Sequence, residues 1–280
     1  MIVWRDGAFV DGKSAVSAGD RGYLIGDGVF ETALVEKGRP AFLAAHLSRL
    51  RRGAAALGLS VATGEDELRA AIEELGARSG ASARAACRIT ATRVGGARGL
   101  VATPDAGTQL LLSLAPIAPA KVSLRAVITE VRRLSTAPTN AFKCIGAYAA
   151  NMLARTEASR AGADEAIMLN EHGRIACASS ANLFIIDGDA IVTPPESEGA
   201  MPGVTRALVI ETAGALGVEV RVEPVDAARI AAAPLLFTNS LIGVLPGGLS
   251  TSAAQPPRLA LRLGAAYEAR LETELSEPAS

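Results

Sequence analysis

The sequence is poor in the residues from which metal clusters, disulfides and histidine-based active sites are built. Its 280 residues include three cysteines (Cys87, Cys144 and Cys177) and two histidines (His46 and His172). The cysteines are odd in number and show no Cys-x-x-Cys spacing, which predicts reduced thiols and no zinc site. Two histidines are hard to build into a histidine triad or a metal cluster. We therefore expect no bound metal.

Long apolar runs and an excess of one charge are also missing. No stretch approaches the roughly 18 consecutive apolar residues of a membrane-spanning helix, and residues 1–6 lack the pattern of a signal peptide. The formal net charge is −1 and there is no long basic run, which argues against nucleic-acid and membrane-surface partners. We therefore expect a cytoplasmic protein. A phosphate-sized ligand is compatible with this charge, because it needs only a local arginine and a helix end.

The composition, 49% hydrophobic and 20% charged, is that of a globular protein with a large core, in one domain or two. The Asp6-Gly7 pair predicts a hairpin turn, and Thr63 is expected to cap a helix. We also expect a loop at 20–22 and a loose tail at 276–280. Hydrophobic periodicity predicts strands at 2–4, 8–10, 28–36, 86–93, 108–114, 122–131, 165–169, 183–186 and 219–222, and helices at 43–57, 65–75, 145–161, 205–216 and 259–271.

A proline-containing segment divides this pattern into two parts. Residues 115–120 (APIAPA) carry two prolines, which interrupt both helices and strand pairing. We therefore predict an N-terminal α/β domain at 1–114, a linker at 115–120 and a C-terminal domain at 121–280. The fold class expected is α+β, that is, mixed α/β.

Lys143 is the most unusual residue of the chain. Of 28 basic residues only four are lysines, and this one lies in the largely apolar segment 139–148 (TNAFKCIGAY). An ammonium is costly to desolvate, so it must be paired, shifted in pKa or converted to an uncharged form such as a Schiff base. The simpler alternative is a lysine whose head group reaches water.

Four sequence blocks occur together in a characteristic order: 20–32 (DRGYLIGDGVFET), 46–50 (HLSRL), Lys143 with Tyr148, and 201–206 (MPGVTR). In order and spacing they resemble the fold-type IV pyridoxal-phosphate (PLP) enzymes, which include branched-chain and D-amino-acid aminotransferases and aminodeoxychorismate lyases. The resemblance runs from Ile2 to about Gly247. It implies PLP as the cofactor, a small N-terminal α/β domain, a larger C-terminal pseudo-barrel domain, and a homodimer whose partner subunit completes the pocket.

The resemblance also implies roles for single residues. Lys143 would form the Schiff base and then move the proton at the substrate carbon, and Tyr148 would lie beside the phenolic oxygen of the cofactor. The alternative for Tyr148 is a half-buried helix residue.

The cofactor phosphate would lie against Arg49, whose guanidinium fork matches phosphate oxygens. The amides of Val204 and Thr205 at a helix start, the Thr205 hydroxyl and the Ser240 hydroxyl would complete the site. The alternatives are a solvent-facing arginine and a plain helix cap at Thr205.

Cys177 departs from the family pattern. In the family a glutamate five residues before the Asn of Asn-Leu-Phe, here Asn182, pairs with the pyridine nitrogen, and Cys177 stands in that place. A thiol supplies no buried carboxylate, so the ring should be a weaker electron sink. Three explanations compete: a neutral ring redirected toward elimination, a binding protein with lost or altered catalysis, or a glutamate supplied from nearby, for which Glu171 is the nearest in sequence.

One segment gives a clue to the substrate. Residues 93–100 (RVGGARGL) resemble the arginine-glycine loop of the lyases and of some D-amino-acid aminotransferases. Arg93 and Arg98 would bind substrate carboxylates, and Phe30 would line the pocket. The alternatives are a glycine-rich hairpin with solvated arginines and a core phenylalanine. The narrowest expectation is an aminodeoxychorismate lyase, with an aminotransferase of D-amino or branched-chain amino acids as the alternative; either takes a small amino acid or amino-carboxylate.

Overall fold

The computed structural model describes residues 1–80, 84–96, 99–119, 121–249 and 256–276. The chain forms two compact units: unit 1 comprises Met1–Ala118, Phe142–Ala147 and Thr273–Ser280, and unit 2 comprises Pro119–Ala141 and Tyr148–Glu272. Two segments of unit 1, Phe142–Ala147 and Thr273–Ser280, were predicted to belong to the C-terminal domain. The short segment that contains Lys143 belongs to the first unit, although it lies beyond the linker in sequence.

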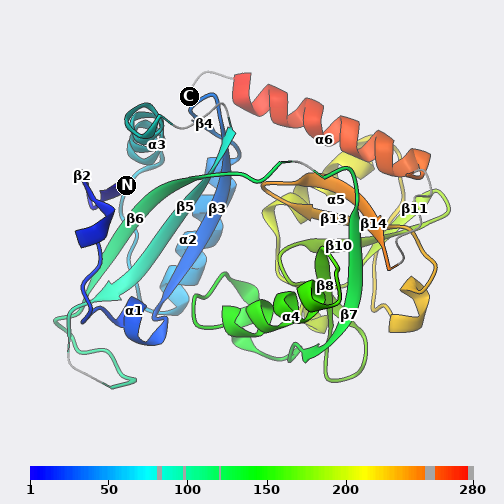
Figure 1. Ribbon diagram of the computed structural model, residues 1–280, viewed down its shortest axis with the longest axis horizontal. Helices are drawn as coiled ribbons and strands as arrows, with labels where there is room; N and C mark the ends of the chain where they lie inside the picture. Colours follow the sequence, from blue (N-terminus) through cyan, green and yellow to red (C-terminus); the bar gives the residue numbers. More distant parts are fainter. Residues whose placement is uncertain (81–83, 97–98, 120, 250–255, 277–280) are drawn as a thin grey trace. The chain divides into compact units, whose positions relative to one another are not determined.

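Unit 1 is built on an antiparallel six-stranded sheet (Figure 1). The predicted hairpin at its edge is confirmed, since β1 and β2 pair across a turn in which Asp6 and Gly7 have φ of 47° and 91°. In sheet order the strands are β2 (Ala8–Asp11), β1 (Ile2–Arg5), β6 (Gly107–Pro116), β5 (Arg84–Val94), β3 (Gly28–Glu36) and β4 (Arg39–Pro40).

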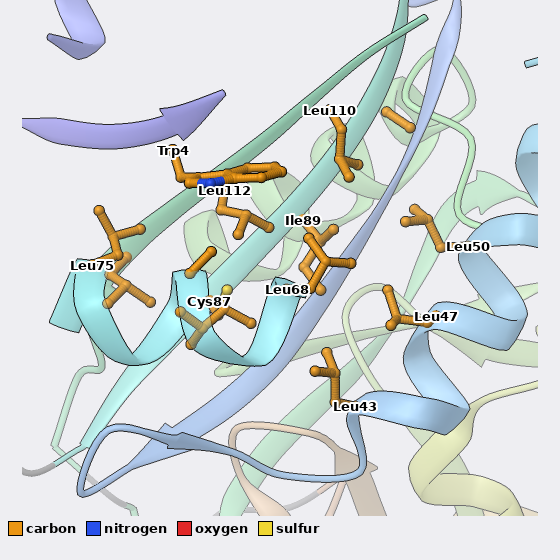
Figure 2. Close-up of a cluster of buried hydrophobic side chains, with 14 of the residues drawn as sticks. Trp4, Leu43, Leu47, Leu50, Leu68, Leu75, Cys87, Ile89, Leu110 and Leu112 are labelled. Atoms are coloured by element: carbon orange, nitrogen blue, oxygen red, sulfur yellow. The ribbon is translucent and has the colours of Figure 1, made fainter. Parts of the chain in front are cut away.

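The helices α2 (Leu43–Ala56) and α3 (Glu65–Ser79) bury their apolar stripes against one face of this sheet. Figure 2 shows Leu43, Leu47 and Leu50 of α2 and Leu68 and Leu75 of α3 directed at sheet side chains. Two expectations were wrong. The short helix α1 (Arg21–Ile25) begins inside the loop that was expected at 20–22. The N-cap residue of α3 is Gly64, not Thr63.

The segment Phe142–Ala147 is attached to the edge of β3. Cys144 forms an isolated antiparallel bridge with Val29, and the Phe30 N–H donates to the Lys143 carbonyl at 2.9 Å. A Cβ on Gly26 would come within 2.8 Å of the Gly146 backbone, so this close approach requires glycine. The pairing fixes the backbone of Lys143 relative to β3.

Unit 2 is built on an eight-stranded mixed sheet. In sheet order the strands are β12 (Val220–Val222), β11 (Ala190–Thr193), β10 (Asn182–Asp187), β13 (Leu235–Asn239), β14 (Gly243–Gly248), β7 (Leu124–Arg132), β8 (Glu165–Leu169) and β9 (Ile175–Ala178). Four of them, β9, β11, β13 and β14, lie where no strand was predicted. The mixed α/β fold class is confirmed.

Three helices belong wholly or mainly to unit 2: α4 (Tyr148–Arg160), α5 (Val204–Ala215) and α6 (Arg258–Ser276). α4 lies against β7 and β8 (Figure 1), and it buries Ala154 and Ala158 there. It begins three residues later than predicted, and α6 continues to Ser276, where a loose tail was expected. Residues 277–280 lie outside the described part. The described residues also form the short 3₁₀ helices η1 (Gly12–Ser14), η2 (Pro138–Ala141), η3 (Glu196–Glu198) and η4 (Ala227–Ile230).

Within the described residues, none of the helices combines the length and the apolar character needed to cross a bilayer.

Candidate functional site

Lys143 lies half-buried in unit 1, with its ammonium over an aromatic ring. Its Nζ atom is 5.0 Å from the centroid of the Phe30 ring, and the Cζ atom of Arg88 is 3.7 Å from the same centroid. Two cations on one ring are a favourable cation–π arrangement and a concentration of positive charge. This concentration of charge can attract an anionic group to the Lys143 amine.

Arg49 lies in a buried cluster with Glu31 and His46. Its Nε and Nη2 atoms donate to the two carboxylate oxygens of Glu31 at 2.6 and 2.7 Å, and His46 Nδ1 lies 2.8 Å from Glu31 Oε2. The exposed fractions are 5% for Arg49 and 1% for each of the other two. The arginine is therefore not solvent-facing; its side-on edge is held by a carboxylate.

The Glu31 carboxyl is ionised in this cluster. Burial alone raises its pKa, but the hydrogen bonds from Arg49 and His46, together with their charges, outweigh burial and bring the pKa from 4.5 to about 2. The cluster thus contains a fixed carboxylate and a fixed guanidinium.

Arg93 is held by three acceptors of unit 1. Its Nε atom donates to Asp27 Oδ2 at 3.0 Å, Nη1 donates to the Gly58 carbonyl at 3.4 Å, and Nη2 donates to the Leu57 carbonyl. These bonds tie the end of β5 to the end of α2 and to Asp27. A contact of Arg93 with substrate stays a prediction, and Arg98 lies outside the described residues.

Cys177 is buried in unit 2, on β9 and opposite Met168 of β8. Burial raises the pKa of its thiol; the Arg133 cation acts in the opposite direction, and the Glu165 carboxylate again raises the pKa. The thiol is therefore uncharged at neutral pH. Arg133 is also buried; its Nε atom donates to the Gly199 carbonyl at 2.7 Å.

Both glutamates near position 177, Glu171 and Glu165, accept hydrogen bonds from other groups. Glu171 accepts from the Ser135 N–H at 2.8 Å and the Ser135 hydroxyl at 2.6 Å. Glu165 is buried and accepts from the Ala166 and Ser179 N–H groups at 2.8 and 3.1 Å and from the hydroxyls of Ser179 and Ser180. That a nearby glutamate replaces the missing carboxylate stays a prediction.

The start of α5 is the anion-binding candidate of unit 2. Gly203 occupies the N-cap position without a side-chain cap, so the first N–H groups of the helix, including those of Val204 and Thr205, have no partner within the helix. Thr205 is 3% exposed, and Ser240, in the turn between β13 and β14, is half-buried. Tyr148 is also half-buried, at the start of α4. Their predicted cofactor contacts stay predictions.

The structure adds Glu31, Arg88 and Glu165 to the residues named from the sequence. Glu31 lies inside a recognised block, but a block does not indicate what its side chain contacts. Arg88 pairs with Thr32 across β3 and β5 and so shares a sheet face with Phe30, a relation that depends on strand register. Strand alternation together with a known register would have found it.

The comparisons with known proteins agree with these observations. The family model described as amino-transferase class IV matches residues 28–248. This chain belongs to the class IV aminotransferases. A putative branched-chain-amino-acid aminotransferase of Methanocaldococcus jannaschii is 32% identical, with 88% of this chain and 86% of the relative covered. The aminodeoxychorismate lyase of Bacillus subtilis is 28% identical, with 88% and 85% covered.

A solved structure of the branched-chain aminotransferase of Thermoproteus uzoniensis, with norvaline, has a TM-score of 0.89. It is 27% identical, and the match covers 99% of this chain and 96% of the other. Another solved branched-chain amino acid aminotransferase of similar fold is complexed with N-(5'-phosphopyridoxyl)-L-glutamate. The predicted fold-type IV architecture, PLP as the cofactor and an enzymatic activity are confirmed by the family and its structures.

The two units contain residues of the kind that the aldehyde and the phosphate of this cofactor require. In unit 1, the half-buried Lys143 amine suits the aldehyde and the buried Arg49 guanidinium suits a phosphate. In unit 2, the uncapped start of α5 is also a group that suits a phosphate. For the pyridine nitrogen, the family position carries the uncharged Cys177 thiol, where a carboxylate is usual.

Proposed function

We propose that this class IV enzyme is an aminodeoxychorismate lyase, which converts 4-amino-4-deoxychorismate into 4-aminobenzoate and pyruvate. The observation that carries the proposal is the buried, uncharged thiol of Cys177. Without a carboxylate partner the ring is a weaker electron sink, and this penalises transamination most. Elimination that ends in an aromatic product has a large driving force and tolerates the weaker sink.

PLP supplies the electron sink, and the residues of the chain supply position and proton transfer. The Lys143 amine, released near the reacting carbon, removes a proton there. The enolpyruvate that leaves gains one proton and becomes pyruvate. One proton is removed and one is added, so the reaction has no net change in protons. Arg49, Val204, Thr205 and Ser240 hold the phosphate and Tyr148 the phenolic oxygen, as proposed from the resemblance.

The substrate is an amino-carboxylate, and cations in unit 1 suit its carboxylate groups. Arg93 and Arg98 are the groups proposed from the sequence, and Arg88 joins them because it stacks on Phe30 beside Lys143. Phe30 is proposed to line the pocket, as the resemblance implies. A guanidinium is the preferred partner of a carboxylate because it can donate two parallel hydrogen bonds.

An aminotransferase of branched-chain or D-amino acids is the second candidate. The similarity to the M. jannaschii branched-chain relative, at 32% identity, favours it. A PLP-binding protein with lost or altered catalysis is the candidate from another class, and Cys177 is again the reason.

The active form is proposed to be a cytoplasmic homodimer. Tyr23, Leu24 and Ile25 of α1 are 71%, 54% and 49% exposed, which is unusual for three consecutive large apolar side chains. A second copy of the chain would cover them. Light scattering should give twice the chain mass of 28.6 kDa, and a monomer would contradict the dimer without affecting the cofactor assignment.

The function is tested with purified protein, PLP and two assays. Release of pyruvate from aminodeoxychorismate, faster than transfer from any of a panel of amino donors, is expected. Transfer to a keto acid without pyruvate release would establish the aminotransferase instead. Borohydride treatment followed by peptide mass analysis should place the reduced cofactor on Lys143; Lys37→Ala, at an exposed lysine, is the control that retains it, and Lys143→Ala should lose it.

A further inference from the structure

The Glu31 carboxylate contacts Arg49 along a single edge of the guanidinium. The two donors are Nε at 2.6 Å and Nη2 at 2.7 Å, one to each carboxylate oxygen. This is the side-on bidentate geometry, in which the two N–H bonds are parallel and point the same way. The end-on edge, formed by Nη1 and the second hydrogen of Nη2, is directed away from Glu31 by the planar geometry of the group.

His46 fixes the carboxylate that fixes the arginine. Its Nδ1 atom lies 2.8 Å from Glu31 Oε2, the oxygen that also accepts from Arg49 Nη2. His46 and Arg49 lie three residues apart on α2, so their side chains lie on the same helix face. Glu31 is therefore held from two positions of one helix, and rotation of its carboxylate would break both contacts.

Stability alone is a weak explanation for this cluster. Two ionised groups and a histidine, all at least 95% buried, carry a large desolvation cost, and apolar residues of similar volume commonly replace buried ion pairs without loss of stability. Such a cluster is better explained by a need for one fixed orientation. The group that gains orientation is Arg49, because both of its side-on donors are engaged.

We propose that Glu31 is a positioning residue which, with His46, turns the end-on edge of Arg49 toward the cofactor phosphate. The proposal rests on Arg49 as a phosphate ligand, which is part of the proposed function. It adds that Arg49 does not act alone in this chain. β3 carries Phe30 beneath Lys143, and through the next residue, Glu31, it also orients Arg49.

The test compares two forms of the cofactor on variants of Glu31. Glu31→Asp keeps the charge but is one methylene too short to reach both Arg49 and His46. Since hydrogen bonds to charged groups are at stake, PLP should bind about tenfold more weakly or worse. Pyridoxal, which lacks the phosphate but can still react with Lys143, should change by less than about twofold. Glu74→Asp, in the exposed pair with Arg78, is the matched control and should change neither.

Glu31→Gln separates orientation from charge. If Glu31 positions Arg49, PLP affinity falls here too, because one acceptor oxygen is lost. A rise in PLP affinity would mean that the carboxylate only offsets the arginine charge, and equal losses for PLP and pyridoxal would mean that it only supports the fold; either result overturns the proposal. Both affinities are measured by absorbance titration on variants whose circular dichroism matches that of the wild type.

A measurement on the unaltered protein covers the case in which the variants do not fold. The Arg49 Nε–H resonance, assigned in ¹⁵N-labelled protein, should remain protected from solvent exchange when PLP is added, because Glu31 keeps the side-on edge. Loss of that protection on PLP binding would show that Glu31 releases Arg49 and would overturn the proposal. If the wild type gives no borohydride-stable adduct on Lys143, the proposed function fails, and this is a separate readout.

Discussion

Phe30 and Glu31 are consecutive residues of β3 that contact the two groups of unit 1 expected to hold the cofactor. The Phe30 ring lies under the Lys143 ammonium, and the Glu31 carboxylate holds the Arg49 guanidinium. Successive side chains of a strand leave its opposite faces, so β3 supports each group from a different side. A shift of β3 by one residue would exchange the two contacts, which makes its register with β5 important for function.

The first prediction concerns Arg88, the second cation on the Phe30 ring. Arg88→Gln should raise the KM for a carboxylate-bearing substrate about tenfold and leave kcat within about twofold, because a charge-assisted contact made in the ground state is lost. Steady-state kinetics at saturating PLP measures both constants. Arg84→Gln, four residues earlier on β5 and paired with Glu36, is the control and should change neither. A fall in kcat with unchanged KM would place Arg88 elsewhere in the reaction.

The second prediction concerns the missing carboxylate. Cys177→Glu should raise the rate of transamination about tenfold or more, equivalent to about 1.4 kcal/mol in the barrier, because a carboxylate partner would keep the ring nitrogen protonated. The buried Arg133 cation would stabilise the new carboxylate at position 177, whereas the Glu165 carboxylate would repel it. Cys177→Ser, which adds no charge, should leave the rate unchanged. An unchanged or lower rate in the glutamate variant would contradict the neutral-ring explanation.

The third prediction concerns stability in acid. The pKa of Glu31 is lowered from 4.5 to about 2 in the folded protein, so its contribution is complete above pH 4.5 and is lost as the pH falls toward 2. The contribution at neutral pH is of the order of 3 kcal/mol, obtained from the difference between the two pKa values. Urea unfolding at a series of pH values should show a steeper loss for the wild type than for Glu31→Gln between these limits. Parallel curves would assign the acid sensitivity to other carboxylates.

The local pattern was sufficient to predict most of unit 1. β3 and α2 are a long strand and a helix with clear periodicity, and Asp6-Gly7 specified the hairpin through its turn chemistry. The strands missed in unit 2 lack such signals. β9 is Ile-Ala-Cys-Ala, with small residues of weak strand preference, and β14 contains three glycines and Pro246. Each strand pairs with the strand before it in the sequence, β9 with β8 and β14 with β13, and β14 also pairs with the distant β7. Their composition therefore explains why they were missed.

The site was predicted only as far as residue identities could be matched to the family. Arg49 and Lys143 came from the recognised blocks, but the pairing of Arg49 with Glu31 depends on how α2 packs on β3, which spacing does not specify. The contacts of Arg93 could not be predicted either, because its acceptors include the carbonyls at the end of α2 and so depend on how α2 packs. Cys177 could be identified as a departure from the sequence alone; its burial beside Glu165 and Arg133 could not.

The last prediction concerns the start of α5 and uses two glycines of the same helix region. A Cβ on Gly203 would lie 2.1 Å from Asn182 Oδ1. Asn182 cannot easily give way, since its Nδ2 atom donates to the Thr238 carbonyl and hydroxyl at 2.8 and 3.0 Å. Gly203→Ala should therefore cost about 1–3 kcal/mol of stability, as overpacking commonly does. It should also weaken PLP binding, because the N–H groups of Val204 and Thr205 move with the backbone.

Gly214→Ala is the opposite case within α5. No atom lies within 4 Å of the added Cβ, and alanine is the better helix former, so stability should rise by about 0.5–1 kcal/mol with PLP affinity unchanged. Urea unfolding and PLP titration on both variants measure the two effects separately. If Gly203→Ala lost stability but bound PLP as tightly as Gly214→Ala, the start of α5 would not hold the phosphate, and the anion site would have to be sought elsewhere in the chain.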